Sequence, residues 1–168
     1  TTAGLWAYNI GDTVEFTSLK PYRVIVSGRI KHFISAFGEH VIGKEVEQAL
    51  KEATANTDIT VNEFTVAPQI NPSEGLPYHE WFIEFENEPK DELRFIQDLE
   101  ASLQKQNSYY FDLIEGKVLR PLVITRVKKD GFQSYMKSIG KLGGQNKIPR
   151  LSNDRKIADS LNDLKLTK

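Results

Sequence analysis

The chain has 168 residues, of which 39% are hydrophobic and 27% are charged. These fractions are close to those of globular proteins, so we expect one folded domain and exclude a disordered tail or a membrane protein. Its 22 basic and 23 acidic residues give a formal net charge of −1, which removes the general electrostatic argument for binding nucleic acid or acidic membranes.

The first predicted element is a β-hairpin or meander over residues 5–28. Apolar and polar residues alternate on either side of the segment 18–21, in which Pro21 supplies the fixed φ that turns favour. The alternating apolar residues are Val14, Phe16, Tyr22, Val24 and Val26. A period of two is typical of β-strands.

A helix is predicted next, over residues 43–55. Its apolar residues recur at helical spacing at Val46, Ala49, Leu50 and Ala53. Glu45 and Glu47 fall in the first turn, where a negative charge suits the helix dipole. We interpret both as residues that stabilise the helix start rather than as a catalytic acid and base.

Residues 59–67 and 77–86 are rich in β-branched and aromatic residues and are predicted to form paired strands. The segment between them has the composition of a turn rather than of a linker between domains. The second strand is predicted to have an inward face of Trp81, Ile83 and Phe85 and an outward face of Glu84 and Glu86. Its aromatic side chains are interpreted as core rather than as a surface for stacking bases.

Three more helices and one strand complete the prediction. A helix follows Pro89, a strand covers residues 122–127, a short helix covers residues 132–139, and a last helix lies near the end. The apolar residues that mark the first and last of these helices are Leu93, Ile96, Leu99 and Leu103, and Ile157, Leu161 and Leu164. With no internal repeat, this order predicts an α+β fold, in which the hairpin or meander is followed by a mixed sheet with packed helices.

The sequence also bears on location. No apolar segment approaches the roughly 20 residues that a membrane helix needs, and the first residues do not form a secretion signal. The chain has no cysteine, which excludes disulfides, a thiolate nucleophile and a zinc site with cysteine ligands, and fits a cytoplasmic protein. Because it starts at Thr1 without Met and leads directly into an apolar run, we expect a piece of a longer protein.

A first candidate site residue is Asp12, which follows Gly11 at the end of the segment GLWAYNIGD, residues 4–12. A carboxylate placed after a strand can accept hydrogen bonds from both hydroxyls of a ribose. A glycine followed by an acidic residue is also a common hairpin turn, and for the pair taken alone the turn is the favoured interpretation.

Residues 28–47 hold a more specific pattern, in which Gly-Arg is followed by an apolar residue, a glycine and the acidic start of a helix. The matching positions are Gly28, Arg29, Ile34, Gly38, Glu45, Val46 and Glu47. This pattern resembles the hinge motif of the adenylate-forming enzyme superfamily, in which the pivot corresponds to Lys31. Lys31 stands where many members have Asp, and Gly43 stands where many have Pro.

A third segment, GGQNKIPR at residues 143–150, places Lys147 in a loop shaped by glycine and proline. Together with the first two segments, it resembles the acyl-acid amido synthetases known in plants as the auxin-responsive promoter family, and particularly their bacterial relatives. The resemblance is concentrated in residues 4–47 and 143–155. The residues between these two segments support it only by their predicted order of helices and strands.

The resemblance implies the small C-terminal domain of a ligase that forms an acyl-adenylate from ATP and a carboxylic acid, then transfers the acyl group to an amino acid and releases AMP. It implies that Asp12 and Arg29 bind the nucleotide, that the domain turns about Lys31, and that Lys147 is catalytic. The implied cofactor is ATP with Mg²⁺, and we predict no metal ligand in this chain.

The resemblance also implies a domain arrangement. Residues 1–28 would form the hairpin or meander that leads to the hinge, and residues 29–168 the C-terminal domain, within a single domain overall. The implied partners are an N-terminal domain outside this chain, a carboxylic acid and an amino acid. Without that N-terminal domain, the chain alone is expected to be inactive.

Other interpretations stay open. Lys147 also fits a solvated loop lysine, and Arg29 also fits a strand-end charge paired with Glu39 or Glu45. At the level of function, the alternatives are the C-terminal domain of an acyl-CoA ligase, whose acceptor is a thiol, and a non-catalytic α+β module that binds a ligand.

The histidines and one tyrosine pair complete the candidates. His32, His40 and His79 have no recurring metal spacing and are interpreted as neutral core or surface residues. Tyr109 and Tyr110 could line a pocket for the amine, but packing is the favoured role for both.

Overall fold

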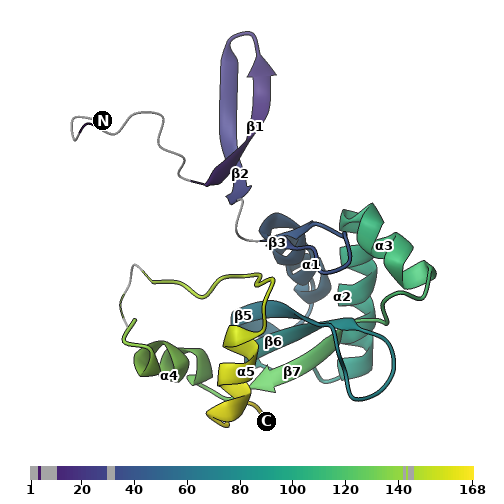
Figure 1. Ribbon diagram of the computed structural model, residues 1–168, viewed down its shortest axis with the longest axis vertical. Helices are drawn as coiled ribbons and strands as arrows, with labels where there is room; N and C mark the ends of the chain where they lie inside the picture. Colours follow the sequence, from purple (N-terminus) through teal and green to yellow (C-terminus); the bar gives the residue numbers. More distant parts are fainter. Residues whose placement is uncertain (1–3, 5–10, 30–32, 142, 144–145) are drawn as a thin grey trace.

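The computed structural model describes residues 4, 11–29, 33–141, 143 and 146–168, with the backbone alone for residues 12 and 27–29. Its architecture is α+β, as predicted, with a small mixed sheet and packed helices (Figure 1). In the described ranges, no helix is long and apolar enough to cross a membrane.

The central sheet has the strand order β5-β6-β7. β5 (Thr60–Gln69) and β6 (Tyr78–Asn87) are antiparallel, and β7 (Val123–Val127) runs parallel to β6. These three strands and the pairing of the first two are therefore confirmed. The parallel addition of β7 makes the sheet mixed, since the chain returns to β6 only after passing through two helices.

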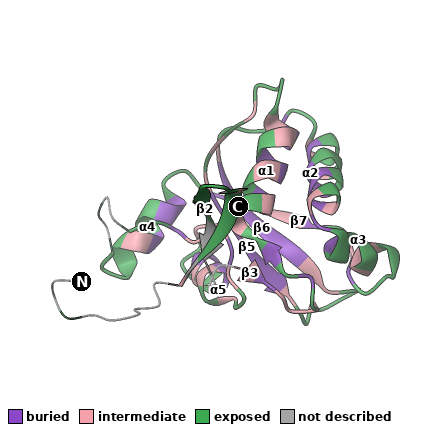
Figure 2. Cartoon of the chain, turned by 90° about the horizontal axis from the view of Figure 1, so that it is seen from above, coloured by how far each residue is buried: buried purple, intermediate pink, exposed green. Residues whose placement is uncertain are grey.

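One face of the sheet is covered by α1 (Gly43–Thr54), α2 (Glu92–Gln106) and α3 (Ser108–Glu115), with the short strands β3 (Phe33–Ile34) and β4 (Val41–Ile42) beside them. Figure 2 shows buried residues gathered in β5 and β6 and along the facing sides of α1 and α2. The predicted buried positions of α1 are all in this core: Val46, Ala49, Leu50 and Ala53. The helix prediction is thus confirmed for α1, whereas no pattern in the sequence predicted α3.

The other face of the sheet is covered by α4 (Gly131–Ser138) and α5 (Lys156–Asp163). The second core consists of Ala67, Phe82, Val127, Phe132, Tyr135, Ile148, Ala158 and Leu161. The prediction that Leu164 lines the last helix is wrong, because Leu164 follows the end of α5 and is 47% exposed.

The prediction that Glu84 lies on an outward face of β6 is also wrong. Glu84 is buried under the second layer of helices, where its carboxylate accepts hydrogen bonds from the N–H groups of Asp130 and Phe132 at 3.0 and 3.3 Å. A carboxylate in this position bonds N–H groups that the first turn of α4 leaves free. Glu80, on the same face of β6, accepts a hydrogen bond from Arg155 at 2.8 Å, just before α5.

Both edges of the sheet are partly closed by C-terminal segments. Beside β5, the N–H of Val66 donates to the carbonyl of Arg150 at 3.0 Å, and beside β7 the N–H of Lys168 donates to the carbonyl of Arg126 at 2.9 Å. These contacts satisfy backbone groups that an open strand edge would expose. The first contact also fixes the segment that follows Lys147.

β1 (Asp12–Leu19) and β2 (Tyr22–Arg29) form the predicted hairpin, which projects away from the rest of the molecule (Figure 1). The part of that prediction at residues 5–10 lies outside the described residues. No described residue of the hairpin belongs to either core. The hairpin is therefore not stabilised by burial against this domain.

Replacement of Leu99 by alanine tests the first core. Leu99 lies in α2 and is fully buried, so we expect Leu99→Ala to lower the free energy of unfolding by about 2–5 kcal/mol. Leu93→Ala is the matched control, because Leu93 lies in the same helix but is 74% exposed. Urea unfolding followed by circular dichroism measures both variants, and equal losses would contradict the assignment of the core.

Candidate functional site

Two predicted site residues, Asp12 and Arg29, meet at the open end of the hairpin. They are direct partners in the register of β1 and β2. Gly11, immediately before Asp12, has a φ of +78°, a left-handed conformation that glycine adopts without steric strain. The backbone thus brings the two positions together, while their binding of a nucleotide stays a prediction.

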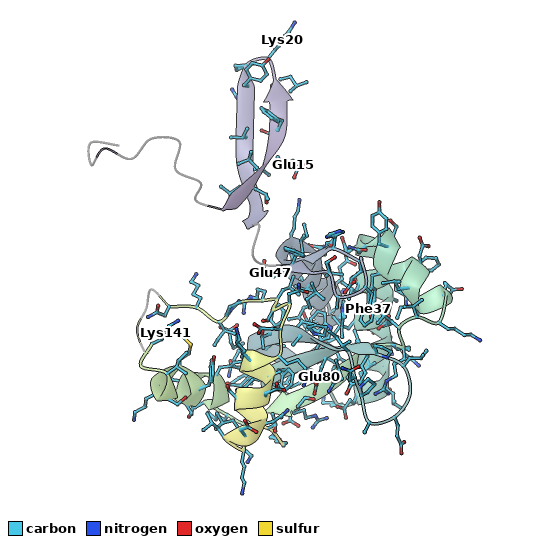
Figure 3. The ribbon with its side chains drawn as sticks, in the orientation of Figure 1. Glu15, Lys20, Phe37, Glu47, Glu80 and Lys141 are labelled. Atoms are coloured by element: carbon cyan, nitrogen blue, oxygen red, sulfur yellow. The ribbon has the colours of Figure 1, made fainter. Side chains whose placement is uncertain are left out.

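Lys147 lies in the loop between α4 and α5, and its side chain is exposed. It lines a cavity of about 690 Å³, and also a neighbouring cavity of about 300 Å³. Lys141 lines both cavities too, and the larger one also borders Glu47 of α1; Figure 3 labels these two residues. Two lysines at the larger cavity favour an anionic group there.

Arg150 fixes the loop that carries Lys147. Its Nε donates to Glu47 of α1 at 3.1 Å, and its Nη1 donates to Glu63 of β5. The guanidinium also lies over the ring of Phe64, 4.7 Å from the ring centroid. Because a planar guanidinium can bind carboxylates at its edge and stack on a ring, Arg150 joins α1, β5 and the loop in one contact.

The segment after Lys147 is also held by polar contacts of its backbone and side chains. The hydroxyl of Thr65 donates to the carbonyl of Pro149 at 2.8 Å, and the N–H of Ser35 donates to Oδ1 of Asn153 at 3.1 Å. Ser35 follows the Gly-Arg of the hinge pattern by a few residues. The structure therefore brings a segment within this pattern and the segment after Lys147 into direct contact.

A buried pair, Glu39 and His79, holds the loop between β3 and β4 against β6. Both side chains are fully buried, and Nε2 of His79 lies 2.9 Å from Oε1 of Glu39. The N–H of Phe37 donates to the other carboxylate oxygen at 2.8 Å. Burial by itself would raise the pKa of Glu39, but hydrogen bonds from His79 and the backbone outweigh it, so this pKa lies below its ordinary value.

Asn107 extends this network to the start of α1. Its amide donates to the carbonyl of Glu39 at 3.1 Å and to the carboxylate of Glu45 at 3.0 Å. Glu45 also accepts from the N–H of Ile42 at 2.9 Å, so its predicted role at the helix start is confirmed. Both oxygens of Glu39 accept hydrogen bonds inside the core.

Sequence reasoning missed the Glu39–His79 pair and the role of Arg150. His79 was expected as core or surface, and it is fully buried two residues before Trp81, on the face of β6 that packs in the first core. Strand alternation around Trp81 is a signal that could have placed His79 inside. No local signal indicates its partner, because Glu39 lies 40 residues away in the chain.

The remaining candidates fall as follows. Tyr110 is fully buried, which agrees with a packing role, whereas Tyr109 is 65% exposed. Lys31 and His32 lie outside the described residues. Within the ranges that the structure does describe, no three histidine or acidic side chains are grouped so that they could hold a metal ion.

Comparison with known proteins identifies the family. Residues 44–156 match the model of the GH3 family C-terminal domain. The chain belongs to the GH3 family. The matched residues of this GH3 domain begin in α1, contain Lys147 and Arg150, and end at the first residue of α5. No curated protein matches the chain.

Two solved structures share the fold of the GH3 domain. A GH3.15 acyl acid amido synthetase matches it with a TM-score of 0.78 and 18% sequence identity, and the AtGH3.15 acyl acid amido synthetase in complex with 2,4-DB matches it with a TM-score of 0.74 and 18% identity. Each match covers 100% of this chain and 32% of the solved chain. The resemblance found in the sequence is therefore confirmed for the family and the fold, and the chain spans about a third of these synthetases.

The pH dependence of unfolding tests the buried pair. Because the pKa of Glu39 is lower in the folded than in the unfolded chain, its carboxylate stabilises the fold at neutral pH, and this contribution is lost as the pH falls below the ordinary value of 4.5. We expect Glu39→Gln to lower the free energy of unfolding by about 1–3 kcal/mol at neutral pH and to weaken its loss in acid.

Glu74→Gln is the matched control for this measurement, because Glu74 is exposed in the turn between β5 and β6. Denaturant unfolding of the three proteins across the acidic range is the measurement. A Glu39→Gln variant with the stability and acid sensitivity of the unmodified chain would contradict the role of the buried pair.

Proposed function

We propose that this GH3 chain acts as the C-terminal domain of an ATP-dependent acyl-acid amido synthetase. In this reaction a carboxylic acid attacks the α-phosphate of ATP, which gives an acyl-adenylate and pyrophosphate. The amine of an amino acid then displaces AMP and forms an amide. The match of residues 44–156 to the GH3 C-terminal domain carries the proposal.

The rest of the reaction's machinery is assigned to the part of the synthetases that this chain does not span. Since the chain corresponds to 32% of each solved synthetase, the pocket for the acid and the loop for the phosphates belong in our proposal to an N-terminal domain. The proposal includes a cytoplasmic location, because the reaction consumes ATP.

We assign the catalytic role in adenylation to Lys147. Attack on the α-phosphate places negative charge on oxygens around the phosphorus, and an ammonium aimed there stabilises the transition state. Its exposure and its place on a cavity of about 690 Å³ support this role, because the ammonium is free to meet an anion. Arg150 supports it further by fixing the loop that presents the lysine.

We assign Asp12 and Arg29 to the nucleotide. A carboxylate accepts hydrogen bonds from ribose hydroxyls, and a guanidinium donates to ribose or phosphate oxygens. Their direct pairing across β1 and β2 supports a shared site, because the two positions are opposite each other in the strand register. ATP enters with Mg²⁺, for which we assign no ligand in this chain.

We assign the pivot to Lys31, with residues 1–28 leading to the hinge and residues 29–168 forming the C-terminal domain. Rotation about this point would bring Lys147 to the nucleotide for adenylation and withdraw it for amide formation. The contact between Ser35 and Asn153 supports this assignment, because it makes the loop of Lys147 move with the segment after the hinge.

Exchange of pyrophosphate into ATP tests the role of Lys147. In the full-length protein, scanned over carboxylic acids, we expect Lys147→Ala to reduce acid-dependent exchange by about 10²–10³-fold, the loss typical of removing one donor to transition-state charge. Lys137→Ala is the matched control, since Lys137 is an exposed lysine of α4 that lines neither cavity. This control should keep normal exchange.

Each other outcome has a defined meaning. Exchange that survives Lys147→Ala would reduce this residue to a loop lysine. Absence of exchange with every acid in the unmodified protein would favour a module that binds a ligand without catalysis. A product assay with CoA in place of amino acids separates thioester from amide formation and thereby tests the acyl-CoA ligase alternative.

Proline at position 31 tests the pivot. Proline fixes φ, so we expect Lys31→Pro in the full-length protein to slow at least one of the two half-reactions. Lys31→Ala removes the charge and keeps the backbone free, so it should leave both half-reactions intact. Separate measurement of pyrophosphate exchange and amide release decides, and unchanged kinetics of both in Lys31→Pro would exclude Lys31 as the pivot.

A further inference from the structure

Lys141 is the second lysine at the cavities that Lys147 lines, and its backbone is fixed at the end of α4. The N–H of Lys141 donates to the carbonyl of Met136 at 2.9 Å, and the N–H of Gly140 donates to the carbonyl of Lys137 at 3.1 Å. Gly140 has a φ of +69°. These two bonds and this left-handed residue form a Schellman motif, a common end of an α-helix. The end of α4 therefore determines the position from which the Lys141 side chain starts.

The two lysines are anchored to different parts of the domain. Lys141 is fixed by α4, whereas Lys147 lies shortly before Pro149 and Arg150, which bond to β5 and α1. Both lysines are exposed, and none of the residues that the structure describes forms a hydrogen bond or ion pair with either ammonium group. Two positive charges held at one cavity from separate elements can act together on one anion.

The charged residues at the two cavities differ in their balance. Those described at the cavity of about 690 Å³ are Lys141, Lys147, Arg150 and Glu47. The only acid among them, Glu47, is already paired with Arg150, whose Nε lies 3.1 Å from its Oε1. The cavity of about 300 Å³ has three acids beside the two lysines, namely Glu63, Glu84 and Asp130. An anion is therefore favoured in the larger cavity, whose volume is within the roughly 300–1,000 Å³ of small-molecule sites.

We propose that Lys141 binds the β- and γ-phosphates of ATP, and hence the pyrophosphate that leaves, while Lys147 meets the α-phosphate. This inference rests on the proposed function. In adenylation, a carboxylate oxygen of the acid forms a bond to the α-phosphorus, and the bond from this phosphorus to the oxygen that bridges to the β-phosphate breaks. That oxygen takes the electron pair and leaves as part of pyrophosphate. Two separate ammonium groups suit an anion whose charge is spread over adjoining phosphates.

The two roles have different kinetic consequences. The charge that Lys147 meets develops as the α-phosphorus is attacked, so loss of this lysine lowers the rate of the step. The β- and γ-phosphates are charged before and after the step, so a contact with them already exists in the bound ground state. Its loss therefore raises KM more than it lowers kcat. The ratio of these two effects distinguishes the role of Lys141 from that of Lys147.

Exchange of pyrophosphate into ATP, measured in the full-length protein at varied pyrophosphate concentration, tests the proposal. We expect Lys141→Ala to raise the KM for pyrophosphate about tenfold, the effect of losing one hydrogen bond to a charged group, and to change the maximal rate much less. Lys141→Arg keeps the charge and should restore most of the affinity. Lys137→Ala is the matched control, because Lys137 is an exposed lysine of α4 that lines neither cavity.

Amide formation from a preformed acyl-adenylate is the second readout. Pyrophosphate has left before this step, so Lys141→Ala should form the amide at the rate of the unmodified protein. A variant whose helix end or fold is disturbed would instead lose both half-reactions. An unchanged KM for pyrophosphate in Lys141→Ala, or an equal loss in both half-reactions, would overturn the proposal and leave Lys141 as a residue that only ends α4.

Lysine acetylation separates this proposal from the proposed function, because it needs no turnover. The full-length protein is acetylated with ATP or with AMP, which lacks the β- and γ-phosphates, and the modified lysines are identified by peptide mass spectrometry. We expect ATP to slow acetylation of Lys141 relative to AMP and to leave Lys137 unaffected. This protection in a protein that exchanges no pyrophosphate with any acid would support the phosphate site while removing the proposed function. Equal acetylation of Lys141 with ATP and AMP would overturn its assignment in an active or an inactive protein.

Discussion

The burial of the Glu39 carboxylate is the constraint on which the arrangement of the candidate site depends. A carboxylate removed from water is costly unless it is bonded, and this one is bonded by His79 and by backbone N–H groups. The loop between β3 and β4 therefore cannot leave β6 without exposing two unpaired polar groups to the core. The Asn107 amide donates to the carbonyl of Glu39 and to the carboxylate of Glu45, so hydrogen bonds connect this loop with the start of α1.

Buried carboxylates act as connectors elsewhere in this domain as well. Glu80 and Glu84 join β6 to the starts of α5 and α4, and Glu100 accepts from the N–H of Leu122 at 2.8 Å, which ties α2 to the segment before β7. Each of them bonds a group on another element, so each is used for structure. The candidate site has the opposite character: Lys147 is exposed, and its position is determined by the contacts of its neighbours rather than by its own. These carboxylates are buried in hydrogen bonds that hold the fold, whereas the lysine proposed as catalytic is exposed.

Local patterns predicted most of the helices and strands, because periods of 3.6 and 2 are visible within a single element. Glu84 was misplaced because β6 is covered on both faces, and a strand buried on both sides does not alternate between apolar and polar surroundings. Family motifs predicted Asp12 and Arg29 as site residues, and the register of the hairpin pairs these two positions. The Glu39–His79 pair escaped prediction because it joins positions 40 residues apart, and only the folded chain brings them together.

The hairpin and the rest of the domain are stabilised differently, and this difference bears on where the domain would move. The domain has two cores and partly closed sheet edges, whereas the described hairpin residues contribute to neither core. Under the proposed function, the paired positions Asp12 and Arg29 lie in the hairpin before the pivot Lys31, and Lys147 lies in the domain after it. A rotation at Lys31 would then separate the lysine from the nucleotide-binding pair and bring them together again. One polypeptide would thereby have two arrangements of the same site, one for each step of the proposed reaction.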